Sequence, residues 1–204
     1  MFGFRFLFGR HLLLALLACA LAPRGWAQQP DSTQWRALIE PKFMRPEVSF
    51  PISGAERTVL VPGYFSENEV HYFSQKDWQA LGLDWPAFQT KAAENATNKT
   101  VKVELVRDRQ KVIQYAALTS ESPLTATAVL SPDFLKKFAD VFGAKLLVAV
   151  PNRFTVFVFP ALASNYKDYA PMILEAYHAT AYPVSVEIFE LSTAGLRAIG
   201  TFEE

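Results

Sequence analysis

The feature that most restricts the fold is a pair of strongly apolar runs separated by a short polar segment. Residues 146–150 and 154–159 are apolar at alternate and intervening positions alike, and Pro151-Asn152-Arg153 lies between them. Strands with this pattern are buried on both faces of a sheet. A Pro-Asn pair suits the middle of a type I turn. The sequence therefore predicts a hairpin at the centre of a β-sheet.

Polar capping residues and apolar spacing predict helices on both sides of this hairpin. Residues that suit an N-cap precede four segments: Asp31 or Ser32, Ser74, Asp84 and Ser131. Apolar side chains then recur at helical spacing. The predicted helices cover 31–39, two pieces within 74–97, 131–143 and 171–180.

Further strands are predicted from short apolar or alternating runs between turn residues. The clearest is 101–106, where Val101, Val103 and Leu105 share one face and Lys102 and Glu104 share the other, which is typical of a half-buried strand. The other predicted strands are 48–52, 58–61, 70–73, 112–118, 126–130, 184–188 and 196–202. Turns are expected at Ser53-Gly54, Pro62-Gly63, Asp108-Arg109-Gln110 and Ala194-Gly195.

The order of these elements favours an α+β fold with a mixed, mostly antiparallel sheet and packed helices. Helices and antiparallel pairs alternate without a regular strand-helix-strand crossover. Residues 28–204 have the length of a single α+β domain, and two lobes, 31–100 and 101–204, are an alternative organisation. The 17 phenylalanines indicate a substantial core.

The N-terminus has the pattern of a secretory signal peptide. Residues 2–10 carry two arginines and no acid, residues 11–22 are almost wholly apolar, and Gly25-Trp26-Ala27 is a small-x-small end. We expect cleavage after Ala27 and a periplasmic or secreted protein. Cys19 lies in an imperfect lipoprotein box, so lipidation of Cys19 is the alternative.

Removal of residues 1–27 changes the charge and the cysteine content. These residues contain three arginines and no acid, so 17 basic and 20 acidic residues remain, with a net charge of −3. A mildly acidic chain argues against general nucleic-acid binding. Cys19 is the only cysteine, so the mature chain would be cysteine-free. A second long apolar segment is missing from the sequence, so we expect no transmembrane span in the mature chain.

Four segments together resemble the YtpQ-like family of uncharacterised bacterial proteins. They are 78–84 (Trp-Gln-Ala-Leu-Gly-Leu-Asp), 92–95 (Ala-Ala-Glu-Asn), 131–135 (Ser-Pro-Asp-Phe-Leu) and 147–153 (Leu-Val-Ala-Val-Pro-Asn-Arg). The resemblance covers about two-thirds of the predicted mature chain, with order and spacing kept. It implies an α+β fold and a bacterial source. It implies no established activity, so no catalytic residue is carried over from it.

Two candidate ligand sites emerge from the sequence. Asn152 and Arg153 lie at the tip of the apolar hairpin, where the planar guanidinium could contact a carboxylate or phosphate, or instead pair with a nearby acid of the protein. Trp78 and Trp85 belong to an aromatic-rich segment. They could form a surface platform for sugars or peptides, or pack in the core.

Residues with catalytic chemistry do not form a recognisable set in the sequence. His71 and His178 are far apart, with no metal-ligand spacing, so we expect no metal and no cofactor. Ser122 and Ser131 lack a nucleophile motif, and Glu67 and Glu69 fit a solvated loop. The glycosylation sequons at Asn95 and Asn98 are incidental if the chain is bacterial.

These observations predict an exported binding or interaction module of the bacterial cell envelope. The alternative is a cell-envelope hydrolase whose catalytic set is assembled only in the fold. An enzyme should bring His71 or His178 beside an acid or a serine in a cleft. A binding module should instead offer an exposed aromatic or apolar surface.

Overall fold

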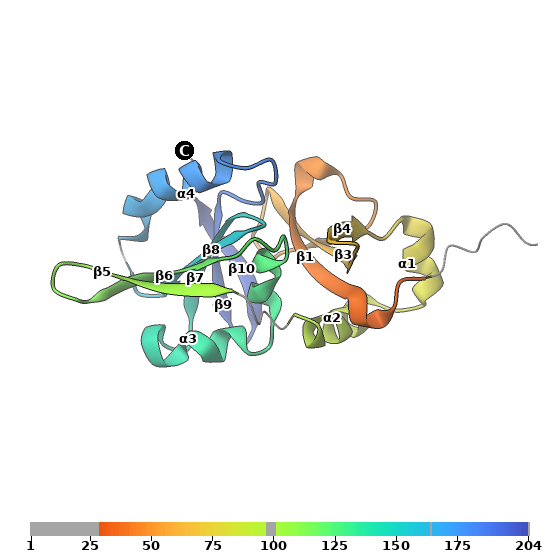
Figure 1. Ribbon diagram of the computed structural model, residues 1–204, viewed down its shortest axis with the longest axis horizontal. Helices are drawn as coiled ribbons and strands as arrows, with labels where there is room; N and C mark the ends of the chain where they lie inside the picture. Colours follow the sequence, from red (N-terminus) through yellow and green to blue (C-terminus); the bar gives the residue numbers. More distant parts are fainter. Residues whose placement is uncertain (1–28, 97–100, 164, 204) are drawn as a thin grey trace, which may run out of the picture.

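The chain folds into two antiparallel sheets with packed helices, with 30% helix and 37% strand (Figure 1). This computed structural model describes residues 29–96, 101–163 and 165–203. The predicted α+β class is confirmed. The predicted signal peptide, Cys19 and Asn98 lie outside the described residues. Within the described part of the chain, no helix is both long and apolar enough to cross a membrane.

The first sheet is built around one long central strand. Strand β3 (Thr58–Ser66) pairs along one edge with β1 (Trp35–Pro41). Its other edge is shared by β2 (Phe50–Pro51) and β4 (Glu69–Tyr72). All these pairings are antiparallel, so β1, β2 and β4 are all joined through β3.

The predicted helix over 31–39 is wrong beyond its first turn. Asp31 does cap a short 3-10 helix, η1 (Ser32–Gln34), but Trp35 then begins β1. Leu38 and Ile39, which the helical spacing placed on one side, belong to different core clusters on the two faces of the sheet. Pairing with the β-branched run of β3 therefore overrides the local helical pattern.

The turn predicted at Pro62-Gly63 is also wrong, because β3 runs through both residues. Gly63 is needed here for close approach. A Cβ at this position would lie 2.5 Å from Leu38 Cδ1 and 2.6 Å from the His71 carbonyl oxygen. Glycine inside a strand often marks such a contact with a neighbouring strand.

The two helices predicted within 74–97 are present, and they pack on one face of the first sheet. Helix α1 (Gln75–Leu81) is capped by Ser74, and α2 (Trp85–Glu94) is capped by Asp84, whose carboxylate accepts from the Ala87 N–H at 2.9 Å. Phe88 of α2 is fully buried and stacks on Trp35 of β1, with 5.3 Å between ring centroids. This aromatic contact holds α2 against the sheet.

The second sheet has six antiparallel strands, and the predicted hairpin lies at its centre. The strand order is β10-β9-β7-β8-β6-β5. The strands are β5 (Lys102–Arg107), β6 (Ile113–Thr119), β7 (Leu146–Asn152), β8 (Thr155–Pro160), β9 (Glu187–Ser192) and β10 (Gly195–Thr201). Asn152 pairs with Thr155, so the hairpin turn consists of Arg153 and Phe154. The type I turn predicted with Pro151-Asn152 at its middle is therefore wrong, because β7 continues through both residues.

Helices α3 (Phe134–Phe142) and α4 (Ala170–His178) cover opposite faces of the second sheet (Figure 1). Val148 of β7 belongs to the same core cluster as the phenylalanines of α3. The neighbouring Leu147 belongs to the cluster around Ile173 of α4. The central strands are thus buried on both faces, which explains their continuous apolar sequence.

The strand predicted at 126–130 is instead a 3-10 helix, η3 (Thr125–Leu130), which packs mainly against β1. A short buried apolar run does not distinguish strand from helix by periodicity alone. The following helix, α3, has Asp133 rather than Ser131 at its N-cap position. Two further 3-10 helices are η2 (Lys42–Met44) and η4 (Tyr166–Tyr169).

Candidate functional site

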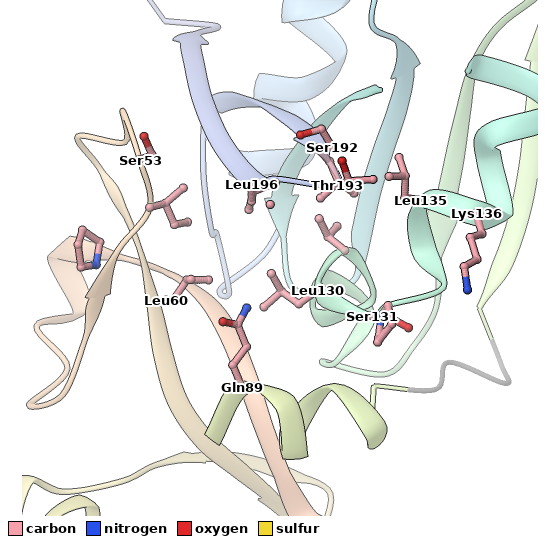
Figure 2. A pocket seen from close by; sticks show the side chains of 16 residues that line it. Ser53, Leu60, Gln89, Leu130, Ser131, Leu135, Lys136, Ser192, Thr193 and Leu196 are labelled. Atoms are coloured by element: carbon pink, nitrogen blue, oxygen red, sulfur yellow. The ribbon is translucent and has the colours of Figure 1, made fainter. Parts of the chain in front are cut away.

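A cleft of about 430 Å³ lies where the two sheets meet, and Figure 2 shows it from close by. This volume lies in the range of small-molecule sites. Four parts of the chain form its walls. They are the β2–β3 region with Ser53 and Leu60, helix α2 with Gln89, the η3–α3 segment with Leu130, Ser131, Leu135 and Lys136, and the β9–β10 hairpin with Ser192, Thr193 and Leu196.

The floor of the cleft is the surface of the main hydrophobic core. Ile52, Leu60 and Val129 are buried members of that core, and Leu130 and Leu196 pack against it while half-exposed. A ligand resting here would cover apolar surface that the protein itself leaves in contact with water. Removal of such surface from water favours binding by roughly 25 cal/mol per Å².

Neutral hydrogen-bonding groups border this floor. The hydroxyls come from Ser53, Ser131, Ser192 and Thr193, and Gln89 adds a carboxamide. Of the described residues that line the cleft, only Lys136 is charged, and its ammonium lies 3.4 Å from the exposed Asp133 carboxylate. The cleft therefore suits a molecule with an apolar body and a few neutral or anionic polar groups.

Backbone contacts beside the cleft join the first sheet to the second. The Ala198 N–H of β10 donates to the Ser53 carbonyl at 2.8 Å, and Ser53 forms a parallel bridge with Arg197. Gly54 follows with a φ of +73°, and a Cβ there would lie 2.6 Å from the Ala198 carbonyl oxygen. The predicted Ser53-Gly54 turn thus also serves to dock the first sheet on the second.

Arg153 does not line this cleft but forms a buried ion pair on another side of the sheet boundary. Its Nη2 lies 2.8 Å from Glu40 Oε1 and donates to the Tyr72 hydroxyl at 2.7 Å. The side chains of Arg153 and Glu40 are only 13% and 3% exposed. The structure therefore shows Arg153 paired with an acid of the protein, which was one of the two interpretations of the sequence.

The electrostatics of this pair follow from its burial. Burial raises the pKa of the Glu40 carboxyl, and the charge and hydrogen bond of Arg153 oppose that rise. Burial and the neighbouring Glu40 carboxylate raise the pKa of the Tyr72 phenol. Arg153 also borders a hollow of about 390 Å³ that contains Glu69 and Glu121. The negative charges of these carboxylates would repel an anion that approached Arg153. Anion binding at Arg153 stays a prediction.

Asn152 connects the hairpin end to helix α4. Its side-chain amide donates to the Ala176 carbonyl at 2.7 Å, and its carbonyl oxygen accepts from the Phe154 N–H at 2.9 Å. The residue is buried and has hydrogen-bond partners for both ends of its side chain. These contacts account for Asn152 as part of the turn structure.

Trp78 and Trp85 are half-buried in an aromatic cluster beside α2. Trp85 stacks on Phe50 with centroids 4.5 Å apart, and Trp78 meets Phe88 edge to face at 5.3 Å. Neither indole is among the described residues that line the cleft. The aromatic segment therefore contributes mainly to packing between α1, α2 and the first sheet.

The two histidines of the described chain lie in different parts of the fold. His71 stacks on Tyr64 in the first sheet at 4.9 Å, whereas His178 is exposed at the end of α4. Neither is among the residues found to line the cleft. The described residues include no group of three or more His, Cys, Asp or Glu that could hold a metal ion.

Other singled-out residues have local structural contacts. Ser122 accepts a hydrogen bond from the Leu124 N–H at 3.3 Å, and Glu67 has a positive φ in the turn before β4. Asn95, the acceptor of the first sequon, donates its side-chain amide to the Ser32 and Trp35 carbonyls at 2.7 and 3.1 Å. Of Ser122 and Ser131, only Ser131 lines the cleft.

Comparisons of the chain with protein-family models, with curated proteins and with solved structures found no match. The candidate site therefore rests on the geometry of this chain. Sequence reasoning identified the Ser53-Gly54 turn, Ser131 and the Ala194-Gly195 turn separately, and Ser53, Ser131 and Gly195 of these line the cleft. Their meeting around one cleft depends on how the two sheets dock, which local patterns do not encode.

Proposed function

We propose that this protein is an exported binding module of the bacterial cell envelope that takes a small amphipathic molecule in the cleft between its sheets. The observation that carries this proposal is the apolar floor, in which Leu130 and Leu196 are half-exposed, bordered by hydroxyl and amide groups in a concavity of about 430 Å³. Small-molecule sites characteristically combine an apolar lining with a few placed polar groups.

The lining also defines the class of ligand. Leu60, Leu130 and Leu196 would contact an aliphatic or aromatic body. The hydroxyls of Ser131 and Thr193 can each donate and accept, so they would accommodate alcohol, amide or carboxylate groups. A multiply charged ligand would lose its hydration over an apolar floor without matching countercharges. A neutral or singly anionic amphiphile is therefore the favoured class.

The cellular setting in this proposal comes from the sequence. The basic start, apolar stretch and small-residue end of residues 1–27 are typical of an export signal. The resemblance to the YtpQ-like family supports a bacterial source. Export of a cysteine-free chain with an apolar cleft is consistent with contact with envelope amphiphiles.

Binding can be tested with the uncharged fluorescent probe N-phenylnaphthylamine, which brightens in apolar sites. The proposal predicts a saturable fluorescence increase with the purified protein. Thr193→Trp, which places a bulky ring at the cleft wall, should weaken binding at least about tenfold, equivalent to about 1.4 kcal/mol. Ala194→Trp is the matched control, because Ala194 lies in the same exposed turn but is not among the residues that line the cleft.

The pair of variants separates cleft binding from other causes. The two variants differ only at neighbouring residues of one turn, so probe uptake elsewhere on the protein would be equal in the two. Equal affinities of Thr193→Trp and Ala194→Trp, or a signal that does not saturate in the unmodified protein, would refute binding in the cleft. Thermal unfolding of each variant checks that the fold is retained.

A further inference from the structure

Among the residues that the structure describes, strand β5 forms an outer edge of the second sheet. It ends the strand order, and its main contacts are with β6. The opposite edge strand, β10, is instead partly covered by Ser53, which bridges Arg197. An uncovered edge strand leaves alternate N–H and C=O groups free to pair with another strand. In Figure 1 the turn between β5 and β6 projects beyond the helices, and β5 is the last strand of the sheet order.

One face of β5 is apolar and the other is charged. Val103 pairs with Leu118 and Leu105 with Ala116, on the side of the core that includes α3. On the other side, Lys102 and Glu104 are exposed, and Lys102 Nζ lies 3.6 Å from Glu104 Oε2. Leu105 is 38% exposed although it shares a face with the core.

The sequence of β5 is self-complementary when two copies of the strand pair in opposite directions. Residues 101–105 read apolar, basic, apolar, acidic, apolar. In a two-fold antiparallel pair centred on Val103, Lys102 lies opposite Glu104 of the second copy. Val101 then lies opposite Leu105. Opposite charges and apolar residues are the favourable cross-strand partners.

Two-fold antiparallel pairs of β5 centred on other residues place less favourable side chains opposite each other. A pair centred on Glu104 would place the two Glu104 carboxylates opposite each other, which is destabilising. A pair centred on Leu105 would place Val103 against Arg107 and Glu104 against Val106, so it would form no opposite-charge pair. The favourable register is thus confined to residues 101–105.

We propose that β5 binds a second copy of this chain through antiparallel pairing of residues 101–105 centred on Val103. The pairing joins two six-stranded sheets into one continuous sheet. On one face, Lys102 and Glu104 of each copy form a four-charge ladder. Because a short strand pair buries little surface, the dimer is weak and depends on protein concentration. This interaction is independent of ligand binding in the cleft.

Sedimentation velocity tests the dimer on the purified protein from about 1 µM to about 500 µM, the range suited to a small, transient interface. The unmodified protein should shift from monomer to dimer over this range. Lys102→Glu and Glu104→Lys should each weaken self-association at least about tenfold, because each puts like charges opposite one another twice. Both positions are exposed, so the monomer fold should persist.

Reversing both charges tests whether the Lys102–Glu104 pairing itself drives self-association. The double variant Lys102→Glu/Glu104→Lys restores both opposite-charge pairs and should recover the dimer. An equimolar mixture of the two single variants should also associate, because their charges are complementary in this register. A monomer at every concentration, a dimer insensitive to the single variants, or a failure of the double variant to recover would each overturn the proposal.

Discussion

Replacing Arg153 by methionine removes the positive partner of a buried carboxylate while keeping most of the side-chain volume. Glu40 is 3% exposed and pairs with Arg153 at 2.8 Å. Tyr72 shares this cluster, since its hydroxyl accepts from Arg153 Nη2. In Arg153→Met, the Glu40 carboxylate would remain buried between the sheets without its ion-pair partner.

The expected loss of stability follows from the cost of an unpaired buried charge. Breaking a buried pair by removing one partner costs about 3–5 kcal/mol. The Arg153 side chain retains 13% exposure, so we expect a value near the lower end, about 3 kcal/mol. For a protein of this size that loss lowers the melting temperature by about 6–12 °C. An arginine that served only to contact a ligand would leave the free protein nearly unchanged.

The loss should also depend on pH in a defined direction. The Glu40 pKa is raised by burial, and removal of the guanidinium raises it further. A carboxyl whose folded-state pKa exceeds its unfolded value contributes stability at low pH, which is lost as pH rises through the folded-state value. The gap between Arg153→Met and the unmodified protein should therefore be largest near neutral pH. It should narrow as the pH falls and Glu40 takes up its proton.

Urea unfolding followed by tryptophan fluorescence, repeated at several pH values, measures this gap. The double variant Glu40→Gln/Arg153→Met lacks the stranded charge, so it should be about 2 kcal/mol more stable than Arg153→Met near neutral pH. Arg109→Met, at an exposed arginine in the β5–β6 turn, should change the free energy of unfolding by less than about 0.5 kcal/mol. A loss below about 1 kcal/mol in Arg153→Met, or no recovery in the double variant, would refute the reasoning.

Three further substitutions test contacts within the first sheet and between the two sheets by the same unfolding measurement. Gly63→Ala should cost about 1–3 kcal/mol, because the added Cβ would lie 2.5 Å from Leu38 Cδ1; an unchanged midpoint would show that β3 shifts freely. Phe88→Ala should cost about 3–5 kcal/mol, because this fully buried ring joins α2 to the first sheet; a loss below about 1 kcal/mol would contradict that packing. Glu187→Gln should cost about 1–3 kcal/mol, because an amide cannot accept all the hydrogen bonds that the carboxylate accepts, whereas the more exposed Glu190→Gln should cost less.

The parts of the fold that sequence predicted best are those with local determinants. Ser74, Gly82 and Asp84 define the ends of α1 and α2 through their own backbone and side-chain hydrogen bonds. The β7–β8 hairpin is apolar on both faces and could be placed centrally from sequence alone. In each case the physical cause lies within a few residues of the feature.

The errors occur where distant partners decide the conformation. Residues 35–39 carry helical spacing, but β3 supplies a strand partner for every residue of the run. Residues 126–130 form a 3-10 helix in which Ala126 donates its N–H to the Arg153 carbonyl at 3.1 Å. The cleft was missed for the same reason, since its walls come from four distant segments.

Buried acids in apolar strands are the sequence signal that points to the docking of the sheets. Glu40 follows Leu38-Ile39 in β1, and Glu187 stands between Val186 and Ile188 at the start of β9. A buried carboxylate requires donors, and both acids find them on the opposite sheet: Glu40 from Arg153, and Glu187 from Thr58 at 2.5 Å.

These polar contacts have consequences for the cleft. Apolar contacts between the sheets supply non-directional attraction, so they tolerate sliding. Hydrogen bonds to Glu187 from the Glu56 and Arg57 N–H groups, at 2.7 and 3.2 Å, have directional geometry. Together with the Ser53–Ala198 backbone bond, they restrict how the two sheets sit on each other. A cleft between sheets held in this way is formed before a ligand arrives, so binding does not require ordering of its walls.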